Sequence, residues 1–240
     1  MRVLAWNLEF VAPSGRKGTA ASRAIDSFRP DVMCLTEARV ASLPVTEQAV
    51  WADADYGYPA PPDRRKVGLW SRWGWHDVDT LGSAAMPQGR FVAGTTPSPE
   101  GPVRVIGICI PWRMAHVATG SRDRAVWQDH LTYLAGLAEV VHAAGDGPLI
   151  VTGDFNQRFH GRMAPGGVHD ALRSALEGLS VPTAVRVEGL RRPLIDHIAH
   201  SPRLETQGPP IGIDRRQHGI DVSDHDGVVV DLAPARPQAT

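Results

Sequence analysis

Cysteine is scarce in this sequence and long apolar runs are missing, and each absence excludes a class of protein. Cys34 and Cys109 are the only cysteines among 240 residues and form no CxxC pair, which excludes a structural zinc site and favours buried free thiols in a reducing compartment. No run of 18 uncharged apolar residues is present, which excludes a membrane-spanning helix. Polar Asn7 and Glu9 interrupt the first apolar stretch too early for a signal peptide. We therefore expect a cytoplasmic protein without a membrane partner.

Lysine is also scarce, and neither sign of charge is in excess. Only Lys17 and Lys66 are lysines among 25 basic residues, which face 26 acidic residues for a net charge of −1 with histidine neutral. This balance gives no global positive field that would hold polyanions, so any affinity for nucleic acid must be local. The planar arginine fork suits bidentate contacts to phosphate or carboxylate, although compositional bias of the genome explains the arginine content equally well.

Short apolar runs bounded by turn residues recur along the whole chain and predict a strand-rich protein. The expected strands are 3–6, 31–36, 67–70, 103–110, 149–152, 194–198 and 227–232. Helical spacing predicts helices over 19–28, ended by Pro30, over 123–144 and over 170–179. Irregular structure is expected at 58–66, 95–102 and 207–210, and none of these segments is long enough for an interdomain linker. We therefore expect one layered α/β domain over residues 1–233, with a flexible tail at 234–240.

Polar side chains gather where the predicted strands end, which is where open α/β sheets tend to bind ligands. The five clusters contain Asn7 and Glu9, Glu37, Asp154 and Asn156, Asp196, and Asp224 and His225. Residues at i and i+2 of a strand point the same way, so Asn7 and Glu9 could share one ligand. Asp196 is expected in the middle of an apolar strand, where a buried carboxylate needs a partner.

Each cluster alone has an ordinary structural explanation, such as a solvated strand end, an Asx turn, a hydrogen-bond anchor or a surface turn. Their combination favours one site, because a hydrophobic core needs none of these groups and a single chemistry would use them all. Hydrolysis of a phosphate ester fits, since it needs charge neutralisation on phosphate, an activated water and help for the leaving oxygen. Mg²⁺ prefers oxygen ligands and would supply the first and the third. The candidate ligands are Glu37 together with Asn7, Glu9 or Asp224.

The remaining groups have roles in the same reaction. Asp154 would orient or deprotonate the attacking water, and neutral Asn156 would donate a hydrogen bond to the phosphate. Asp196 could hold the His225 ring in one tautomer and favour its cationic form beside the phosphate. The buried charge of Asp196 would then have its partner.

These segments together resemble the endonuclease/exonuclease/phosphatase superfamily. The matching motifs are WN at Asn7, the strand ending in Glu37, GDFN with Asp154 and Asn156, the strand with Asp196, and SDH with Asp224 and His225. They stand in the family's order and span positions 6 to 225. The resemblance implies a four-layer α/β/β/α sandwich of two mixed β-sheets flanked by helices, with one active site at its rim and Mg²⁺ or Mn²⁺ as cofactor. It places the equivalents of Glu37 and Asn7 in the metal site and those of Asn156 and His225 against the phosphate.

The sequence departs from the family pattern at Cys109, where many relatives carry a His or Tyr that contacts the phosphate or the leaving group. Three explanations are open: metal-bound water protonates the leaving group, His116 or Arg113 substitutes for the missing residue, or turnover is slow. Glu9 also differs, since relatives that use this position often have Asp.

Substrate choice is expected in the loops around the site. Trp112 could stack on a base or sugar, and Arg113 and Arg158 are candidate phosphate contacts, although most such arginines are solvated surface. We expect a metal-dependent phosphodiesterase that acts on nucleic acid, and favour a monomer. A small-molecule phosphatase or phosphodiesterase of the same family is the alternative, and a non-catalytic binding module on this fold, suggested by Cys109, is a further one.

Overall fold

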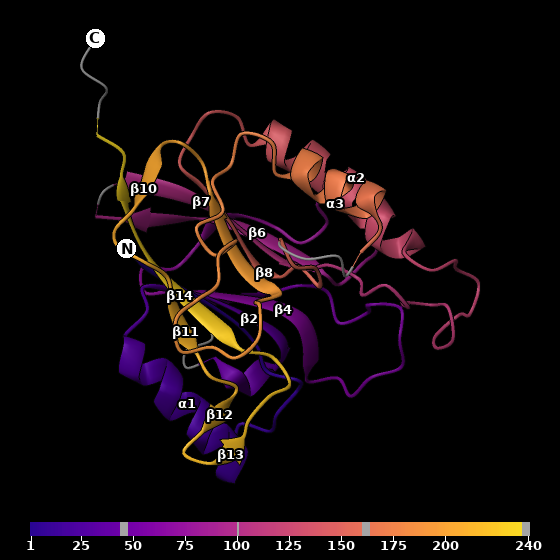
Figure 1. Ribbon diagram of the computed structural model, residues 1–240, viewed down its shortest axis with the longest axis horizontal. Coiled ribbons are helices and arrows are strands. Elements are labelled where there is room, and N and C mark those ends of the chain that lie inside the picture. Colours follow the sequence, from indigo (N-terminus) through magenta and orange to yellow (C-terminus); the bar gives the residue numbers. More distant parts are fainter. Residues whose placement is uncertain (44–47, 100, 160–163, 237–240) are drawn as a thin grey trace.

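Two mixed β-sheets lie face to face, and helices cover both outer faces of the pair (Figure 1). The computed structural model describes residues 1–43, 48–99, 101–159 and 164–236. The first sheet has the order β10 (Leu204–Thr206), β14 (Gly227–Pro234), β1 (Arg2–Asn7), β2 (Val32–Arg39), β4 (Arg64–Ser71) and β3 (Ala49–Trp51), with β11 (Ile211–Ile213) also paired to β14. The second sheet has the order β5 (His76–Asp79), β6 (Phe91–Ser98), β7 (Gly101–Cys109), β8 (Leu149–Asp154) and β9 (Asp196–His200). A small hairpin joins β12 (Arg216–Gln217) and β13 (Ile220–Asp221).

Helices connect the parallel strand pairs of both sheets. Parallel neighbours cannot be joined by a tight turn, so each pair needs a crossover. The helix α1 (Arg16–Phe28) connects β1 to its parallel partner β2, and α2 (Gln128–Ala143) connects β7 to its parallel partner β8. The helix α3 (Gly166–Ala175) packs beside α2, and a 3-10 turn η1 (Val40–Ser42) follows β2. Figure 1 shows α1 on one outer face and α2 with α3 on the other, so the expected four-layer sandwich is confirmed.

Central strands are buried on both faces, which explains why they are continuous apolar runs in the sequence. In β1, Val3 and Ala5 lie in the core between the two sheets, whereas Leu4 and Trp6 pack toward α1. A third apolar cluster, with Phe91 among its members, fills the space between the second sheet and the helices α2 and α3. Burial on both faces fixes the position of each strand end, and the polar clusters lie at those ends.

Most predicted elements are confirmed, with corrections at their boundaries. The end of α1 is as expected, since Arg29 adopts the left-handed conformation just before Pro30. The second helix begins at Gln128 rather than at Asp123, because Trp127 has a positive φ of 71° and interrupts the helical path. The third begins and ends about four residues earlier than expected.

Two further expectations about strands are wrong. Asp196 is the first residue of β9 and does not lie in the middle of a strand. The segment 95–102 is largely a hairpin of β6 and β7. The strand β14 continues to Pro234, and Ala235 N–H donates to Arg203 O (2.9 Å). Residues 237–240 of the expected tail lie outside the described ranges, so its flexibility stays a prediction. Among the described residues, none of the helices has the length and apolar character needed to cross a bilayer.

Candidate active site

A cavity of about 430 Å³ lies at the strand ends where the two sheets meet. Glu37 comes from β2 of the first sheet, Asp154 from β8 of the second, and His225 from the turn before β14. The described residues that line the cavity are Glu37, Tyr56, Tyr58, Lys66, Arg90, Trp112, Thr119, Asp154, Asn156, Asp224 and His225. Glu37 and His225, which are far apart in the sequence, therefore share one hollow.

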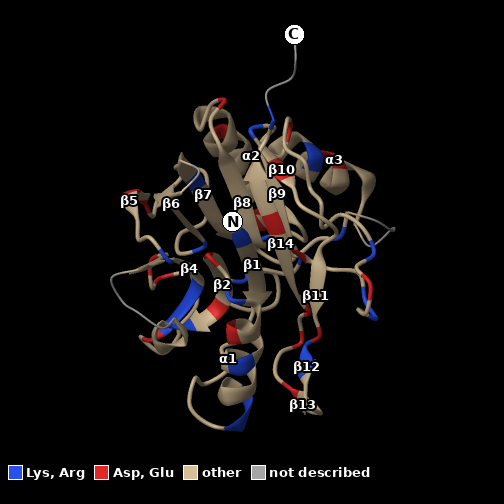
Figure 2. Cartoon of the chain, turned by 90° about the vertical axis from the view of Figure 1, so that its left-hand side faces the viewer, with Lys and Arg blue, Asp and Glu red and all other residues tan. Residues whose placement is uncertain are grey.

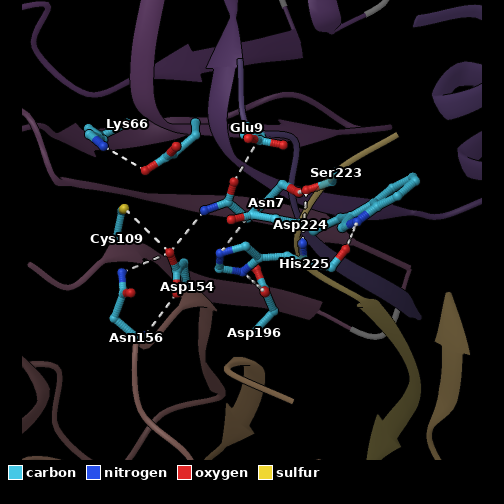
Figure 3. Close-up of polar contacts among 12 residues, drawn as sticks. Asn7, Glu9, Lys66, Cys109, Asp154, Asn156, Asp196, Ser223, Asp224 and His225 are labelled. Carbon is cyan, nitrogen blue, oxygen red and sulfur yellow. Dashed lines mark hydrogen bonds and ion pairs between the residues drawn. The ribbon is translucent and has the colours of Figure 1, made fainter. Parts of the chain in front are cut away.

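Asp154 is at the centre of the hydrogen-bond network (Figure 3). Its Oδ2 accepts from Asn7 Nδ2 and Asn156 Nδ2, both at 2.9 Å, and its Oδ1 accepts from the backbone N–H of Asn156 (2.8 Å). Burial raises the pKa of Asp154 to about 7, with His225 opposing that shift. A carboxylate with this pKa and no freedom to rotate can accept a proton from water near neutral pH.

The preceding glycine allows Asp154 to take this position. Gly153 has a φ of 133°, a conformation that other residues rarely adopt, and a side chain there would collide with the Ile108 carbonyl oxygen of β7. The Gly in the GDFN motif is thus explained by the close approach of two strands.

His225 is bound by two acidic residues, as expected for Asp196. His225 Nδ1 lies 2.7 Å from Asp196 Oδ2, and Nε2 lies 3.7 Å from Asp224 Oδ1. Burial alone would lower the pKa of His225, but the charges of Asp196, Asp154 and Asp224 together raise it to about 10. The ring is therefore an imidazolium at neutral pH, and it presents a positive charge to the cavity.

Glu37 holds a cation in the same cavity. Its Oε1 accepts from the Lys66 ammonium at 2.6 Å, and its backbone has a positive φ of 44°. Glu37 and Asp224 both line the cavity, and their carboxylates are oxygen donors of the kind that Mg²⁺ or Mn²⁺ prefers. One further group, Asp154, Asp196 and His225, also has ligand atoms within 4.8 Å of one another. His225 Nδ1 is hydrogen-bonded to Asp196 Oδ2, and Asp154 Oδ2 accepts from two side-chain amides, so these three residues form a hydrogen-bond network.

Two polar predictions need correction. The strand β1 ends at Asn7, and Glu9 has a φ of 48°, so the two side chains do not follow strand alternation. The Glu9 backbone N–H donates to Asn7 Oδ1 (2.9 Å), and Glu9 is not among the described residues that line the cavity. Asn156 Nδ2 donates to both Asp154 Oδ2 and Ile110 O, so its amide hydrogens position Asp154 instead of pointing at a phosphate.

Cys109 does not replace the His or Tyr of the family pattern. It is completely buried, and its Sγ lies 3.9 Å from Asp154 Oδ2. Burial and the charge of Asp154 raise its pKa well above the usual range, so the group remains a thiol. Both cysteines are free and buried, as expected. Of the substitutes considered for this position, His116 packs against the ring of Tyr58 at 4.4 Å between centroids, and the phenol of Tyr58 lines the cavity.

The loop residues predicted to bind substrate are only partly brought together. Trp112 is 47% exposed and lines the cavity. Arg158 borders a smaller hollow of about 130 Å³ on the other side of His225 and Asp224. Arg113 is not among the described residues that line either hollow.

Arg90, a buried arginine of the cavity wall, was not predicted from the sequence. Its Nη1 has long contacts of 3.5 Å to Cys109 O and 3.9 Å to Cys109 Sγ. Among the described residues, no carboxylate forms an ion pair with it. No local signal could have found it, because Arg90 precedes a strand and follows an ordinary turn.

Comparison with known proteins agrees with this fold. Among solved structures, an AP endonuclease from Archaeoglobus fulgidus is similar with a TM-score of 0.71 and 16% identity, over 97% of this chain and 99% of that one. A 3′ phosphatase, NExo, from Neisseria bound to product DNA hairpin gives 0.67 and 19%, over 97% and 99%. The human Nocturnin catalytic domain with bound sulfate gives 0.69 and 16%, over 98% and 94%.

At the level of sequence, curated proteins give no significant match. The model of the endonuclease/exonuclease/phosphatase family, however, matches residues 4–225. The chain therefore belongs to the endonuclease/exonuclease/phosphatase family, whose members are metal-dependent hydrolases of phosphate esters.

Proposed function

We propose that the protein hydrolyses phosphodiester bonds in nucleic acid, with a water activated by Asp154 and a divalent ion at Glu37. The observation that carries the proposal is the buried Asp154 with a pKa of about 7, facing the same cavity as three cationic groups. These groups are Lys66, Arg90 and the imidazolium of His225. The relatives named for an AP endonuclease and for a 3′ phosphatase bound to DNA support nucleic acid as the substrate class.

Each polar residue of the cavity has a separate role in the proposed reaction. Asp154 accepts the proton of the attacking water, and Asn7 and Asn156 hold its carboxylate in place. His225, kept cationic by Asp196, stabilises charge on the non-bridging phosphate oxygens. Arg90 reaches the cavity without a carboxylate partner among the described residues, so its guanidinium is free to bind a phosphate.

A divalent ion would be held by Glu37, with Asp224 and Asn7 as further oxygen donors. When bound, Mg²⁺ or Mn²⁺ supplies charge neutralisation and assistance to the leaving oxygen. This assistance would compensate for the absence of a His or Tyr at Cys109, because the thiol is buried and neither His116 nor Arg113 is among the described residues that line the cavity.

Hydrolysis of bis(p-nitrophenyl) phosphate with Mg²⁺ or Mn²⁺, beside an EDTA control, tests the proposal. We expect metal-dependent release of nitrophenol, and a fall in kcat of about 100-fold or more in Asp154→Asn and in His225→Ala. Circular dichroism verifies that both variants are folded. Full activity in two folded variants, or no metal-dependent signal on this substrate and on DNA and RNA, would contradict the proposal and favour the binding module.

Small phosphate esters are a second candidate, favoured by the balanced charge of the molecule. Figure 2 shows basic and acidic residues interspersed over the chain, in keeping with the net charge of −1. A substrate that contacts many phosphates loses affinity steeply with added salt, since each contact releases counterions. We expect kcat/KM on DNA to fall by about tenfold or more between 50 and 200 mM salt. Equal salt dependence for DNA and for a mononucleotide ester would favour the small substrate.

A further inference from the structure

One of the two lysines of the chain lies inside the candidate active site, bound to the residue proposed to hold the metal. Lys66 is on β4, and Glu37 is near the end of its antiparallel neighbour β2. Thr36 pairs with Val67 and Ala38 pairs with Arg65, so Glu37 lies opposite Lys66. Opposed residues of antiparallel strands share a face of the sheet, so the two side chains meet in the cavity. The Lys66 Nζ to Glu37 Oε1 distance is 2.6 Å, and Figure 3 shows Lys66 with this ion pair at the edge of the Asp154 network.

Two aromatic rings fix the ammonium beside Glu37. Lys66 Nζ lies 5.2 Å from the ring centroid of Phe10 and 5.2 Å from that of Tyr56, within cation–π distance of both. Only 12% of the Lys66 side chain is exposed. The positive charge therefore has three attractive partners and little access to water, and it remains next to the Glu37 carboxylate even if the direct contact opens.

We propose that Lys66 is an internal competitor of the divalent ion at Glu37, and that it sets the metal affinity of the site. A metal ion that binds Glu37 either displaces the ammonium from Oε1 or ligates through Oε2, and in both cases it lies close to a cation that the two rings retain. Both effects oppose metal binding, and in a half-buried site they are screened less than at the surface. This inference rests on the proposed function, because it takes Glu37 as a metal ligand.

Calorimetric titration of Mn²⁺ into the purified full chain, without substrate, tests this role directly. In Lys66→Met, the Kd for Mn²⁺ is expected to fall by about tenfold or more relative to wild type, since the ammonium that binds Glu37 is removed. Lys66→Arg keeps the charge and is expected to bind within about threefold of wild type. Lys17→Met removes the only other lysine, which is exposed on α1, and should leave the Kd unchanged.

Thermal melting with and without metal distinguishes a change in metal binding from a loss of folded structure. Without metal, Lys66→Met should melt below wild type because Glu37 loses its counter-ion, and saturating Mn²⁺ should raise its Tm by more than it raises that of wild type. Glu37→Gln should weaken Mn²⁺ binding and abolish the gain from Lys66→Met in the double variant. If wild type binds Mn²⁺ and Lys66→Met binds with an equal or weaker Kd, the competitor role is overturned alone. If neither binds Mn²⁺, or Glu37→Gln binds normally, the proposed function is overturned with it.

Discussion

At the scale of single residues, the electrostatic balance of the site should be visible as a pH dependence of stability. His225 has a pKa of about 10 in the folded protein, above its unfolded value of about 6.5. The folded state therefore binds this proton more tightly than the unfolded state does. The stability that this proton adds to the fold is fully present below about pH 6.5 and is lost as the pH rises to about 10. Without metal, the Tm of wild type should fall between pH 8 and pH 10. This fall should be larger, by about 3 °C or more, than the fall in the double variant Asp196→Asn/His225→Gln. The double variant replaces the charged pair by two neutral side chains of similar shape, and its Tm is measured in the same way. Parallel pH profiles for the two proteins would mean that His225 is already neutral at pH 8.

The sequence predicted which residues gather at the site better than it predicted what each one does. Asp154, Asp196 and His225 were found because a carboxylate or imidazole at a strand end has no role in an apolar core. The function of Asn156 as a support for Asp154 depends on the backbone conformation, with a φ of 48°, which no local pattern encodes. The segment 64–66 was expected among the basic segments that border the site, and Lys66 lines the cavity. Arg90 was not predicted, because a lone arginine before a strand is equally explained by an exposed surface.

At the scale of elements, Gly153 at the end of β8 gives the sharpest prediction. Gly153→Ala should destabilise the protein by about 2–4 kcal/mol, because its φ of 133° is strained for alanine and the new methyl group meets the Ile108 carbonyl. Urea unfolding measures the change. We also expect kcat to fall, since displacement of Asp154 by about 1 Å costs about 100-fold in rate. Gly147→Ala, in the loop before β8, is the matched control: nothing lies within 4 Å of the added methyl group, and stability should change by less than about 1 kcal/mol. Similar stabilities for the two variants would show that β7 and β8 can separate without cost.

The elements themselves were predictable wherever the apolar pattern was continuous. The strands β1, β2 and β8 are buried along most of their length, so each contains a continuous apolar run, and their positions were found. The strand β5 is exposed along most of its length, and β12 has only two residues, so neither carries a hydrophobic signal. The start of α2 was placed too early because residues 123–127 are compatible with a helix. There, Arg113 O accepts the backbone N–H of Trp127 (2.8 Å) and holds the loop in another path.

At the scale of the whole molecule, the site joins the two sheets. Asn7 of the first sheet donates to Asp154 of the second (2.9 Å), and His225, before β14, pairs with Asp196 of β9 (2.7 Å). Neither contact can form unless the apolar faces of the sheets are in register. Activity therefore requires the complete sandwich, and the sheets should unfold as one cooperative unit.

Leu69 tests this coupling from a position in the core. It is completely buried on β4, and a methyl group on Gly107 of β7 would lie 2.9 Å from its Cδ2, so the two sheets touch there. Leu69→Ala should lower the free energy of unfolding by about 2–5 kcal/mol. In this variant the transitions measured by tryptophan fluorescence, far-UV circular dichroism and activity should share one urea midpoint. Leu81→Ala, at a side chain that is 76% exposed, should change the free energy by less than about 0.5 kcal/mol. Loss of activity at a lower urea concentration than loss of secondary structure would show that the sheets separate before they unfold. In that case the contacts of Asn7 and His225 would be too weak to hold the site together on their own, and the core between the sheets alone would determine whether the enzyme is assembled.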